Sequence, residues 1–397
     1  MSAVILAQNG TNQELTCVSL ATGTKCLSAS AIPKCKGLVL HDCHAEVLAL
    51  RGFNYWLLSE VQQILGSQTH QSPYLEFIQG ETANTDEENS RLPTGPPLKI
   101  KDNISIHFFT TQAPCGDASM EILTESFPSE AATPWPVDDS TATVLQGRGH
   151  FSLLGYVRRK PARADAEASL SKSCTDKLAV KQFSSALSFP TDLFIRKTDS
   201  AYIQSLVVYA DQYHSAGYER AFGQTGRLSK IGSIGHFFNI EPLPVGFPRF
   251  AFDRKQRKSD TQSHSKYKAS NVSAVWILDK KPDKPDIIEV LINGVKQGYK
   301  QLDDKTGKAS AVSRRGLWNL ALSIGSLVGK DQNGEDLDPV YDNPEWLTVV
   351  HHVLSRGTYD EAKSSYVRSS SVNCRSQVTD SLGNWVKNTG DGGWSYS

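Results

Sequence analysis

The sequence predicts one large α/β domain, spanning residues 1–397, with a helical C-terminal third. Three observations support this fold class. Segments with strand-like and helix-like patterns alternate along the chain. No internal repeat or long low-complexity linker divides it. Apolar residues make up 39% of the composition, which is typical of a globular protein.

The predicted elements follow from residue periodicity. Residues 45–64 place apolar side chains at helical spacing, and residues 104–110 alternate in the manner of a half-buried strand. Residues 118–123 resemble the start of a helix after a Cys-Gly turn, and residues 37–40 are a short apolar run. Further strands are expected at residues 203–210, 273–278 and 287–292.

Three polar stretches interrupt these elements. They cover residues 80–100, 125–142 and 253–270, and they are rich in Pro, Ser, Thr or charged residues. None is long enough to separate independent domains. We therefore expect surface insertions within a single domain.

Composition indicates the cellular compartment, and the distribution of charge indicates a type of partner. Seven cysteines, an odd number without a framework of spacings, indicate reduced thiols inside the cell. No signal peptide and no apolar run of roughly 18 residues is present, so we expect a cytoplasmic or nuclear protein without membrane spans. The 42 basic and 42 acidic residues cancel, but basic residues cluster at 156–181 and 254–258. Such clusters suit a nucleic-acid partner, although a solvated loop is the alternative for the second one.

Three short motifs carry ligands that suit zinc. They are His44-Ala45-Glu46, Pro114-Cys115 after a predicted strand, and Ser173-Cys174. A catalytic zinc site needs three protein ligands and an open position for water. A glutamate two residues after the histidine, at the start of a helix, can face that water without binding the metal. His-x-Glu followed by Pro-Cys is most of the zinc deaminase motif.

The third ligand is less certain from spacing alone. In the usual Pro-Cys-x-x-Cys motif a second thiolate would stand at position 118, which is Ala118 here. Cys174 is the best candidate on context, because it lies in a basic segment that leads into a helix-like stretch. The alternatives are Cys17, Cys26, Cys35, Cys43 and Cys374.

The boxes HDCHAE, PCGD and SCTDK resemble those of the adenosine deaminases acting on RNA. The resemblance spans nearly the whole chain and implies a cytidine-deaminase-like core sheet flanked by helices. It also implies that zinc is bound by His44, Cys115 and Cys174, and that Glu46 is the proton shuttle. Residues 293–298 and 313–318 fit the family less specifically.

Within this family the chain is most similar to the tRNA-specific branch. The match begins within the first few tens of residues, so we expect no separate double-stranded RNA-binding modules. The duplex editors carry an acid where Gly147-Arg148-Gly149 has Arg148, and residues 159–165 also resemble the tRNA branch. The implied substrate is adenosine 37, next to the anticodon of alanine tRNA. The expected RNA-binding residues are Thr24, Lys25, Arg148, Arg158, Arg159, Lys160 and Arg163.

The resemblance further implies a buried inositol hexakisphosphate. Two positions depart from the family pattern, because Leu50 and Val180 stand where basic residues are expected. Lys181 is only near a family position. The residues expected to bind this cofactor are Arg51, Lys177, Lys181, Tyr359, Lys363, Trp385 and Lys387.

Two other functions are compatible with parts of this pattern. A deaminase of free nucleosides or of cytidine would normally be shorter and would use the Pro-Cys-x-x-Cys spacing. A catalytically silent zinc-containing RNA-binding protein would not need Glu46, and its metal would have a closed fourth position. The motifs therefore favour RNA deamination.

Overall fold

The computed structural model describes most of the chain. The described ranges are residues 1–10, 14–67, 71–78, 95–126, 145–147, 153–160, 166–250, 270–279, 285–328, 344–369 and 374–395. The predicted insertions at 80–100, 125–142 and 253–270 lie largely outside these ranges. Among the helices described, none has the length and apolar character needed to cross a membrane.

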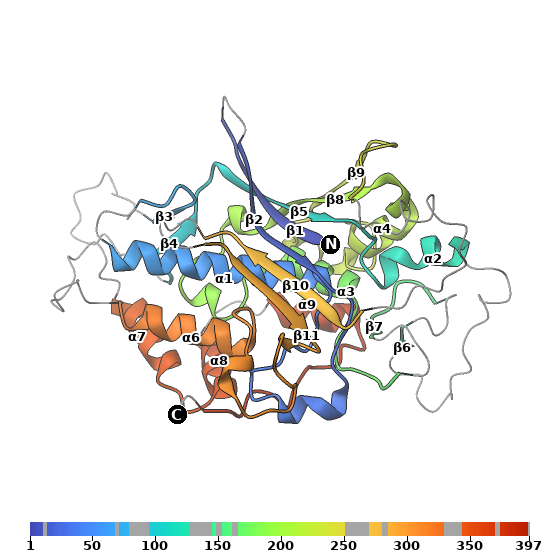
Figure 1. Cartoon of the computed structure of the whole chain (residues 1–397). Helices are drawn as coiled ribbons and strands as arrows, with labels where there is room; N and C mark the ends of the chain where they lie inside the picture. Colours follow the sequence, from blue (N-terminus) through green and yellow to red (C-terminus); the bar gives the residue numbers. More distant parts are fainter. Residues whose placement is uncertain are drawn as a thin grey trace.

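An eight-stranded mixed sheet forms the centre of the fold (Figure 1). Its spatial order is β12-β11-β10-β2-β1-β5-β8-β9, with parallel pairing only between β5, β8 and β9. Its strands are β1 Ser2–Gln8, β2 Glu14–Thr22, β5 Ile104–Thr110, β8 Ile203–Tyr209, β9 Asn239–Leu243, β10 Val272–Ile277, β11 Ile287–Ile292 and β12 Val295–Lys296. Two small ladders pair β3 Leu75–Phe77 with β4 Leu98–Ile100 and β6 Leu145–Gln146 with β7 Arg158–Arg159.

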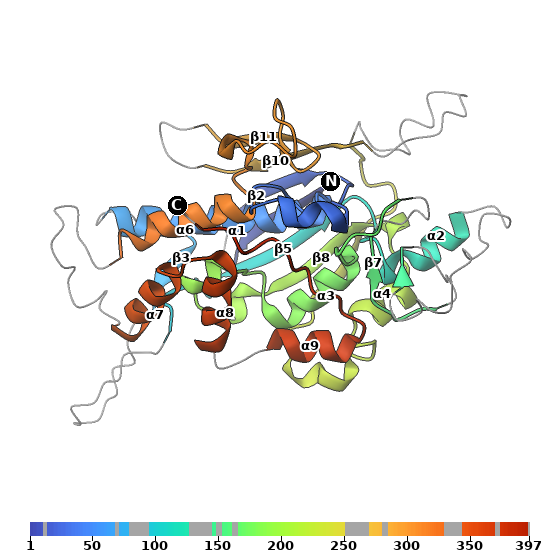
Figure 2. The same cartoon turned by 90° about the horizontal axis from the view of Figure 1, so that it is seen from below.

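Helices pack along the sheet, and the longest lies directly on it. This helix, α1 Ala45–Gly66, contacts β1, β2 and β10, and α6 lies beside it in both views (Figures 1 and 2). Close packing there requires Gly52, because a Cβ at that position would lie 2.2 Å from Ser19 Oγ. The other described α-helices are α2 Met120–Ser126, α3 Cys174–Ser184, α4 Ser215–Phe222, α6 Arg314–Gly325, α7 Pro344–Leu354, α8 Tyr359–Ser369 and α9 Cys374–Leu382.

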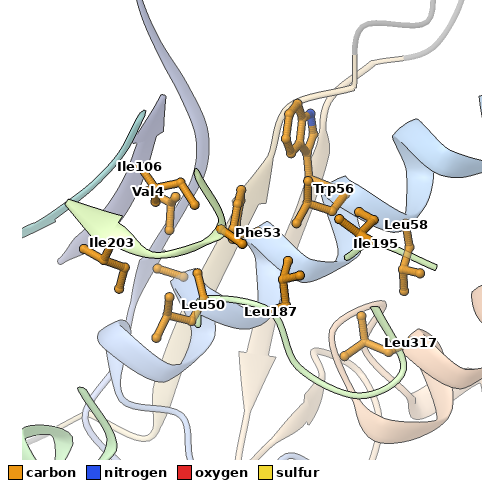
Figure 3. Close-up of a cluster of buried hydrophobic side chains, with 14 of the residues drawn as sticks. Val4, Leu50, Phe53, Trp56, Leu58, Ile106, Leu187, Ile195, Ile203 and Leu317 are labelled. Carbon is orange, nitrogen blue, oxygen red and sulfur yellow. The ribbon is translucent and has the colours of Figure 1, made fainter. Parts of the chain in front are cut away.

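The main core lies around α1. Figure 3 shows Leu50, Phe53 and Trp56 of this helix among side chains from β1, β5, β8 and α6. Phe53 and Trp56 are almost completely buried, and their rings lie 6.0 Å apart. The helix is apolar on most sides, as expected for an element enclosed between a sheet and other helices.

The structure confirms the mixed α/β fold class. The predicted strands at 104–110 and 287–292 coincide with β5 and β11, and the helix expected at 45–64 is α1. The helical C-terminal third corresponds to α6, α7, α8 and α9. No strand is predicted for β1 and β2, which form the middle of the sheet and pair antiparallel through a register shift between Val4 and Ile5.

The central position of α1 gives a direct test of this core. Phe53→Ala is expected to lower the free energy of unfolding by about 3–5 kcal/mol, because it removes a fully buried ring and leaves a cavity. Ile288→Ala on β11 is the control, since Ile288 is 71% exposed and its truncation should change stability by less than about 0.5 kcal/mol. Urea unfolding followed by tryptophan fluorescence measures both. Equal effects of the two substitutions would contradict the placement of the core.

Candidate metal centre

The first part of the site is the start of α1. His44 is the N-cap residue of this helix, with an extended backbone, and its N–H donates to Asp42 Oδ1 at 3.0 Å. Glu46 is in the first helical turn, where a negative charge is favoured by the helix dipole. The segment before the helix is fixed by neighbouring backbone, because Cys43 N–H donates to Lys25 O and Ala45 N–H to Gly23 O.

The second part joins the loop after β5 to the start of α3. Gly116 has a φ of +113°, and a Cβ there would lie 2.3 Å from Ser173 Oγ, so only glycine permits this approach. Thr175 N–H donates to Cys115 O, and Thr175 Oγ1 donates to Pro114 O at 2.9 Å. These contacts hold Cys115 against the first turn of α3.

Three potential ligand atoms converge where these segments meet. His44 Nδ1 lies 3.8 Å from Cys115 Sγ and 3.7 Å from Cys174 Sγ, and the three atoms are all within 4.8 Å of one another. In a tetrahedral zinc site, ligand bond lengths of about 2.0 and 2.3 Å place nitrogen and sulfur about 3.5 Å apart. The separations therefore suit a single zinc ion. The remote Cys174, 130 residues from His44, is the third member of this cluster.

A buried lysine lies directly behind the sulfur ligands. Lys160 Nζ donates to Cys174 Sγ at 3.2 Å and to Asp42 Oδ2 at 2.8 Å. The same carboxylate oxygen accepts from Lys177 Nζ and from Ser171 Oγ. Asp42 therefore links the backbone of His44 to the cation beside Cys174.

Electrostatics favour the charged forms of Asp42, Lys160 and Cys115, whereas burial raises the pKa of the Cys174 thiol well above its usual value. Burial opposes the charge of Asp42, but Lys160 and Lys177 hold the pKa of that carboxyl well below its usual value. Burial also opposes the charge of Lys160, and Asp42 followed by Cys174 raises its pKa well above the usual value. Hydrogen bonding from Cys174, with further help from Lys160 and His44, lowers the pKa of the Cys115 thiol well below its usual value. A thiolate is the form that binds a metal.

Glu46 is a buried acid whose charge acts on this cluster. It is only 8% exposed, and its charge contributes to the raised pKa of Cys174 and of Lys160. Its charge also acts on Tyr218 of α4, where burial followed by the charge of Glu46 raises the pKa of the phenol. A carboxylate is thus positioned beside the three potential ligands without being one of them.

The basic run at 158–160, which the sequence predicts to contact RNA, is largely enclosed in the protein. Arg158 is 1% exposed and Lys160 4% exposed, and both side chains bond within the chain. The Arg158 guanidinium donates to Leu153 O and Gly147 O, and so supports the backbone next to the centre. Arg159 is half-buried. Arg148 and Arg163 lie outside the described residues.

Two of the expected RNA-binding residues do lie beside the centre. Thr24 is exposed and Lys25 is half-buried, in the segment whose backbone bonds to residues 43–45. Thr24 Oγ1 donates to Ser270 O at 3.4 Å. The structure therefore places Thr24 and Lys25 at the N-terminal end of α1, where His44 lies.

A second group of cations gathers between α1, α3, α8 and α9. Burial lowers the pKa of Arg51 to about 10, of Lys181 to about 7 and of Lys363 to about 8. Lys363 is exposed on α8 even though burial is the main cause of its lowered pKa, so this group of cations is only partly enclosed. Arg51 Nε donates to Val312 O, while its buried NH2 nitrogen has no hydrogen-bond partner among the described residues.

Two cations of this group, Arg375 and Lys172, are not among the cofactor-binding residues predicted from the sequence. Arg375 of α9 repels Lys172, Lys181 and Lys363, and in each case helps lower the lysine pKa. Lys172 lies 5.0 Å from the ring centre of Trp385, and burial lowers its pKa to about 7. No local motif marks these positions, because α9 reaches α3 only through tertiary packing (Figure 2).

The remaining residues predicted to bind the cofactor lie in different places. Tyr359 is buried beside Arg51, and burial raises the pKa of its hydroxyl. Lys177 instead pairs with Asp42 near the metal centre. Lys387 is exposed.

Comparison with known proteins agrees with this geometry. The chain is 33% identical over 337 residues to tRNA-specific adenosine deaminase 1 of Schizosaccharomyces pombe, covering 83% of this chain and 79% of the relative. It is 29% identical to the Drosophila melanogaster protein of the same name over 81% of this chain and 74% of that one. Double-stranded RNA-specific editase B2 of Mus musculus is 26% identical over 70% of this chain and 34% of its own length.

A family model described as the adenosine-deaminase (editase) domain matches residues 19–389. That range contains His44, Glu46, Cys115 and Cys174 and nearly all of the described fold. The chain therefore belongs to the adenosine-deaminase (editase) domain family.

Proposed function

We propose that this protein is a zinc-dependent deaminase that hydrolyses adenosine to inosine in tRNA. The observation that carries the proposal is the convergence of His44, Cys115 and Cys174 beside the carboxylate of Glu46. Three protein ligands leave a fourth position open, as a hydrolytic zinc site requires. The core around it would correspond to a cytidine-deaminase-like sheet.

The donor set fits zinc rather than a hard cation. One imidazole and two thiolates suit a borderline-soft metal, whereas calcium and magnesium prefer oxygen ligands. Lys160 would stabilise the thiolate of Cys174 by donating to its sulfur, and Asp42 would hold Lys160 in that orientation. When bound, zinc supplies a Lewis acid that lowers the pKa of a water molecule towards neutrality.

Glu46 would move the proton. The reaction replaces the amino group at C6 of adenine with the oxygen of water and releases ammonia, so both protons must leave that oxygen, one to N1 of the ring and the other to the departing nitrogen. A carboxylate oxygen of Glu46 can accept that proton and then donate it to the amine. Its low exposure keeps bulk water from competing for the proton.

A tRNA substrate is supported by the relatives with the greatest coverage. Those from Schizosaccharomyces pombe and Drosophila melanogaster are named tRNA-specific adenosine deaminase 1. We extend this substrate class to the present chain, with adenosine 37 of alanine tRNA as the proposed target. Thr24 and Lys25 are the proposed RNA contacts among the described residues, since they lie beside the candidate centre.

The interior cations fit a polyanion, and inositol hexakisphosphate is the proposed cofactor. Burial lowers the pKa of Lys181, Lys363 and Arg375, and Arg375 adds repulsion to each of the two lysines. A bound polyphosphate would offset both costs and would supply an acceptor for the unpaired nitrogen of Arg51. Lys172 and Arg314 would extend this site.

Metal binding can be tested without an activity assay. Cys174→Ala is expected to abolish the single equivalent of zinc measured by mass spectrometry of metal content, because it removes one of three ligands. Cys17→Ala is the control, since Cys17 lies on β2 and its thiol bonds only to nearby backbone. Full zinc content in Cys174→Ala would rule out the proposed ligand set.

The role of Glu46 separates catalysis from binding. Glu46→Gln preserves the size of the side chain but removes its capacity to accept a proton. We expect unchanged zinc content and tRNA affinity, with inosine formation slower by at least roughly 10²-fold. Near-normal turnover would show that another group moves the proton. A wild-type protein that binds zinc and tRNA but forms no inosine would instead favour the silent RNA-binding alternative.

The interior lysines predict a specific pH dependence of stability. In protein freed of polyanion, Lys172, Lys181 and Lys363 have folded-state pKa values of about 7, 7 and 8, below the usual 10.5. Between pH 8 and 10 the unfolded chain then holds more protons on these lysines than the folded chain, so their contribution to the free energy of unfolding should rise with pH. The buried thiols of Cys35 and Cys43, with pKa values raised to about 12, contribute the opposite slope, so the lysine part is isolated by comparing variants. Bound hexakisphosphate should favour the charged lysines and abolish or reverse that slope.

Denaturant unfolding at several pH values measures this dependence. Lys181→Met should reduce the slope of the polyanion-free protein, whereas the exposed Lys305→Met should leave it unchanged. A slope that hexakisphosphate does not alter would contradict a polyanion site among these lysines.

A further inference from the structure

A second buried cluster of ionisable side chains lies outside the candidate metal centre. Cys35, His41 and Asp391 place their sulfur, nitrogen and oxygen atoms within 4.8 Å of one another. Asp391 is 3% exposed and lies 350 residues from His41 in the sequence. The proposed deamination reaction assigns no role to any of them.

The contacts of Asp391 indicate a hydrogen-bonded junction rather than another metal site. Its Oδ2 lies 2.7 Å from His41 Nε2, and its Oδ1 accepts from Gly37 N–H at 2.7 Å. The guanidinium of Arg314 lies 3.5 Å from the same Oδ2 and also donates to the backbone oxygen of Asp391. A metal cation would have to displace the His41 contact and would be repelled by Arg314.

The junction fixes the segment that leads directly to His44. Asp391 holds this segment at two points, the backbone of Gly37 and the side chain of His41. Between them, Leu40 N–H donates to Gly294 O, and the His41 carbonyl accepts from Leu27 N–H. His41 is three residues before His44 and adjacent to Asp42, so its position helps set both.

The C-terminal segment that carries Asp391 is itself held on several elements. Figure 2 shows it running from α9 back towards α6, and its Val386 O accepts from Lys172 Nζ. Trp394 stacks on Tyr359 of α8 with ring centres 5.0 Å apart, and Asp360 N–H donates to Gly392 O. Asp391 thus projects from a firmly anchored segment.

A close approach to Gly37 completes the junction. Gly37 has a φ of +72°, and a Cβ there would lie 2.5 Å from the Trp394 ring. The chain therefore requires glycine at the point where the C-terminal segment crosses residues 37–44. Residues 37–41 are therefore held at both ends. Gly37 packs closely against Trp394, and His41 is hydrogen-bonded to Asp391.

We propose that Asp391 and His41 are positioning residues for the proposed metal centre. They act through the backbone of residues 37–44, which delivers His44 to the metal and Asp42 to Lys160. The expected effect on kcat rests on the proposed function. The expected effect on zinc release does not require that the protein deaminates tRNA. Both side chains are buried, so we expect RNA binding not to depend on them.

The test compares Asp391→Asn, His41→Gln and the double variant with wild-type protein. Zinc release to a chelator and kcat and KM with a tRNA transcript are measured on protein shown to be folded by circular dichroism. We expect each single variant to release zinc about 10-fold faster. This factor is the lower end of the losses in metal affinity caused by mutating residues that orient the ligands. We expect kcat to fall by a similar factor while KM stays unchanged.

The double variant and a surface control sharpen the result. Because the two side chains act as one pair, the double variant should be no worse than the more impaired single variant. Asp304→Asn is the matched control, since it breaks the exposed ion pair with Lys36 next to Gly37 and should leave zinc release unchanged.

A purely structural role would give a different pattern. If both single variants melt at lower temperature but release zinc at the wild-type rate, the proposal is overturned. If wild-type protein binds zinc without deaminating tRNA, the proposed function fails, while the zinc-release comparison still decides the positioning role. His41→Gln serves as the deciding variant if Asp391→Asn does not fold.

Discussion

The packing of α1 against the sheet determines where the chemistry can occur. Its buried face, with Phe53 and Trp56 at the centre, fixes the helix axis relative to β1, β2 and β10. The start of that helix then has one location, at the end of the sheet where β5 leads into Cys115. Cys174 reaches the same location because α3 also begins there. The candidate ligands, far apart in the sequence, thus meet through core packing.

Buried charge is the second constraint, and the protein meets it in two ways. Near the metal centre, Asp42 and Lys160 offset each other, so both remain charged without solvent. In the second group, burial outweighs the neighbouring acids and lowers the pKa values of Arg51, Lys181 and Lys363. The first arrangement is complete within the chain. The second is most readily explained by an anion that the chain itself does not supply.

The sequence predicted the elements that have strong local patterns and the site residues that belong to short motifs. Residues 104–110 and 287–292 alternate clearly, and His44-Ala45-Glu46 and Pro114-Cys115 are recognisable from spacing and chemistry alone. Lys160 was misjudged because a run of basic residues normally faces solvent, and only tertiary packing brings it to Asp42 and Cys174. The same reason hides Asp391 and Arg375, whose partners lie far away in the sequence.

The central claim concerns inosine in tRNA, and sequencing of total tRNA tests it most directly. Inosine is read as guanosine after reverse transcription, so tRNA from cells with and without this protein can be compared position by position. The account predicts that the guanosine reads next to the anticodon of alanine tRNA revert to adenosine when the protein is absent. Unchanged inosine at every tRNA position in cells lacking the protein would contradict it.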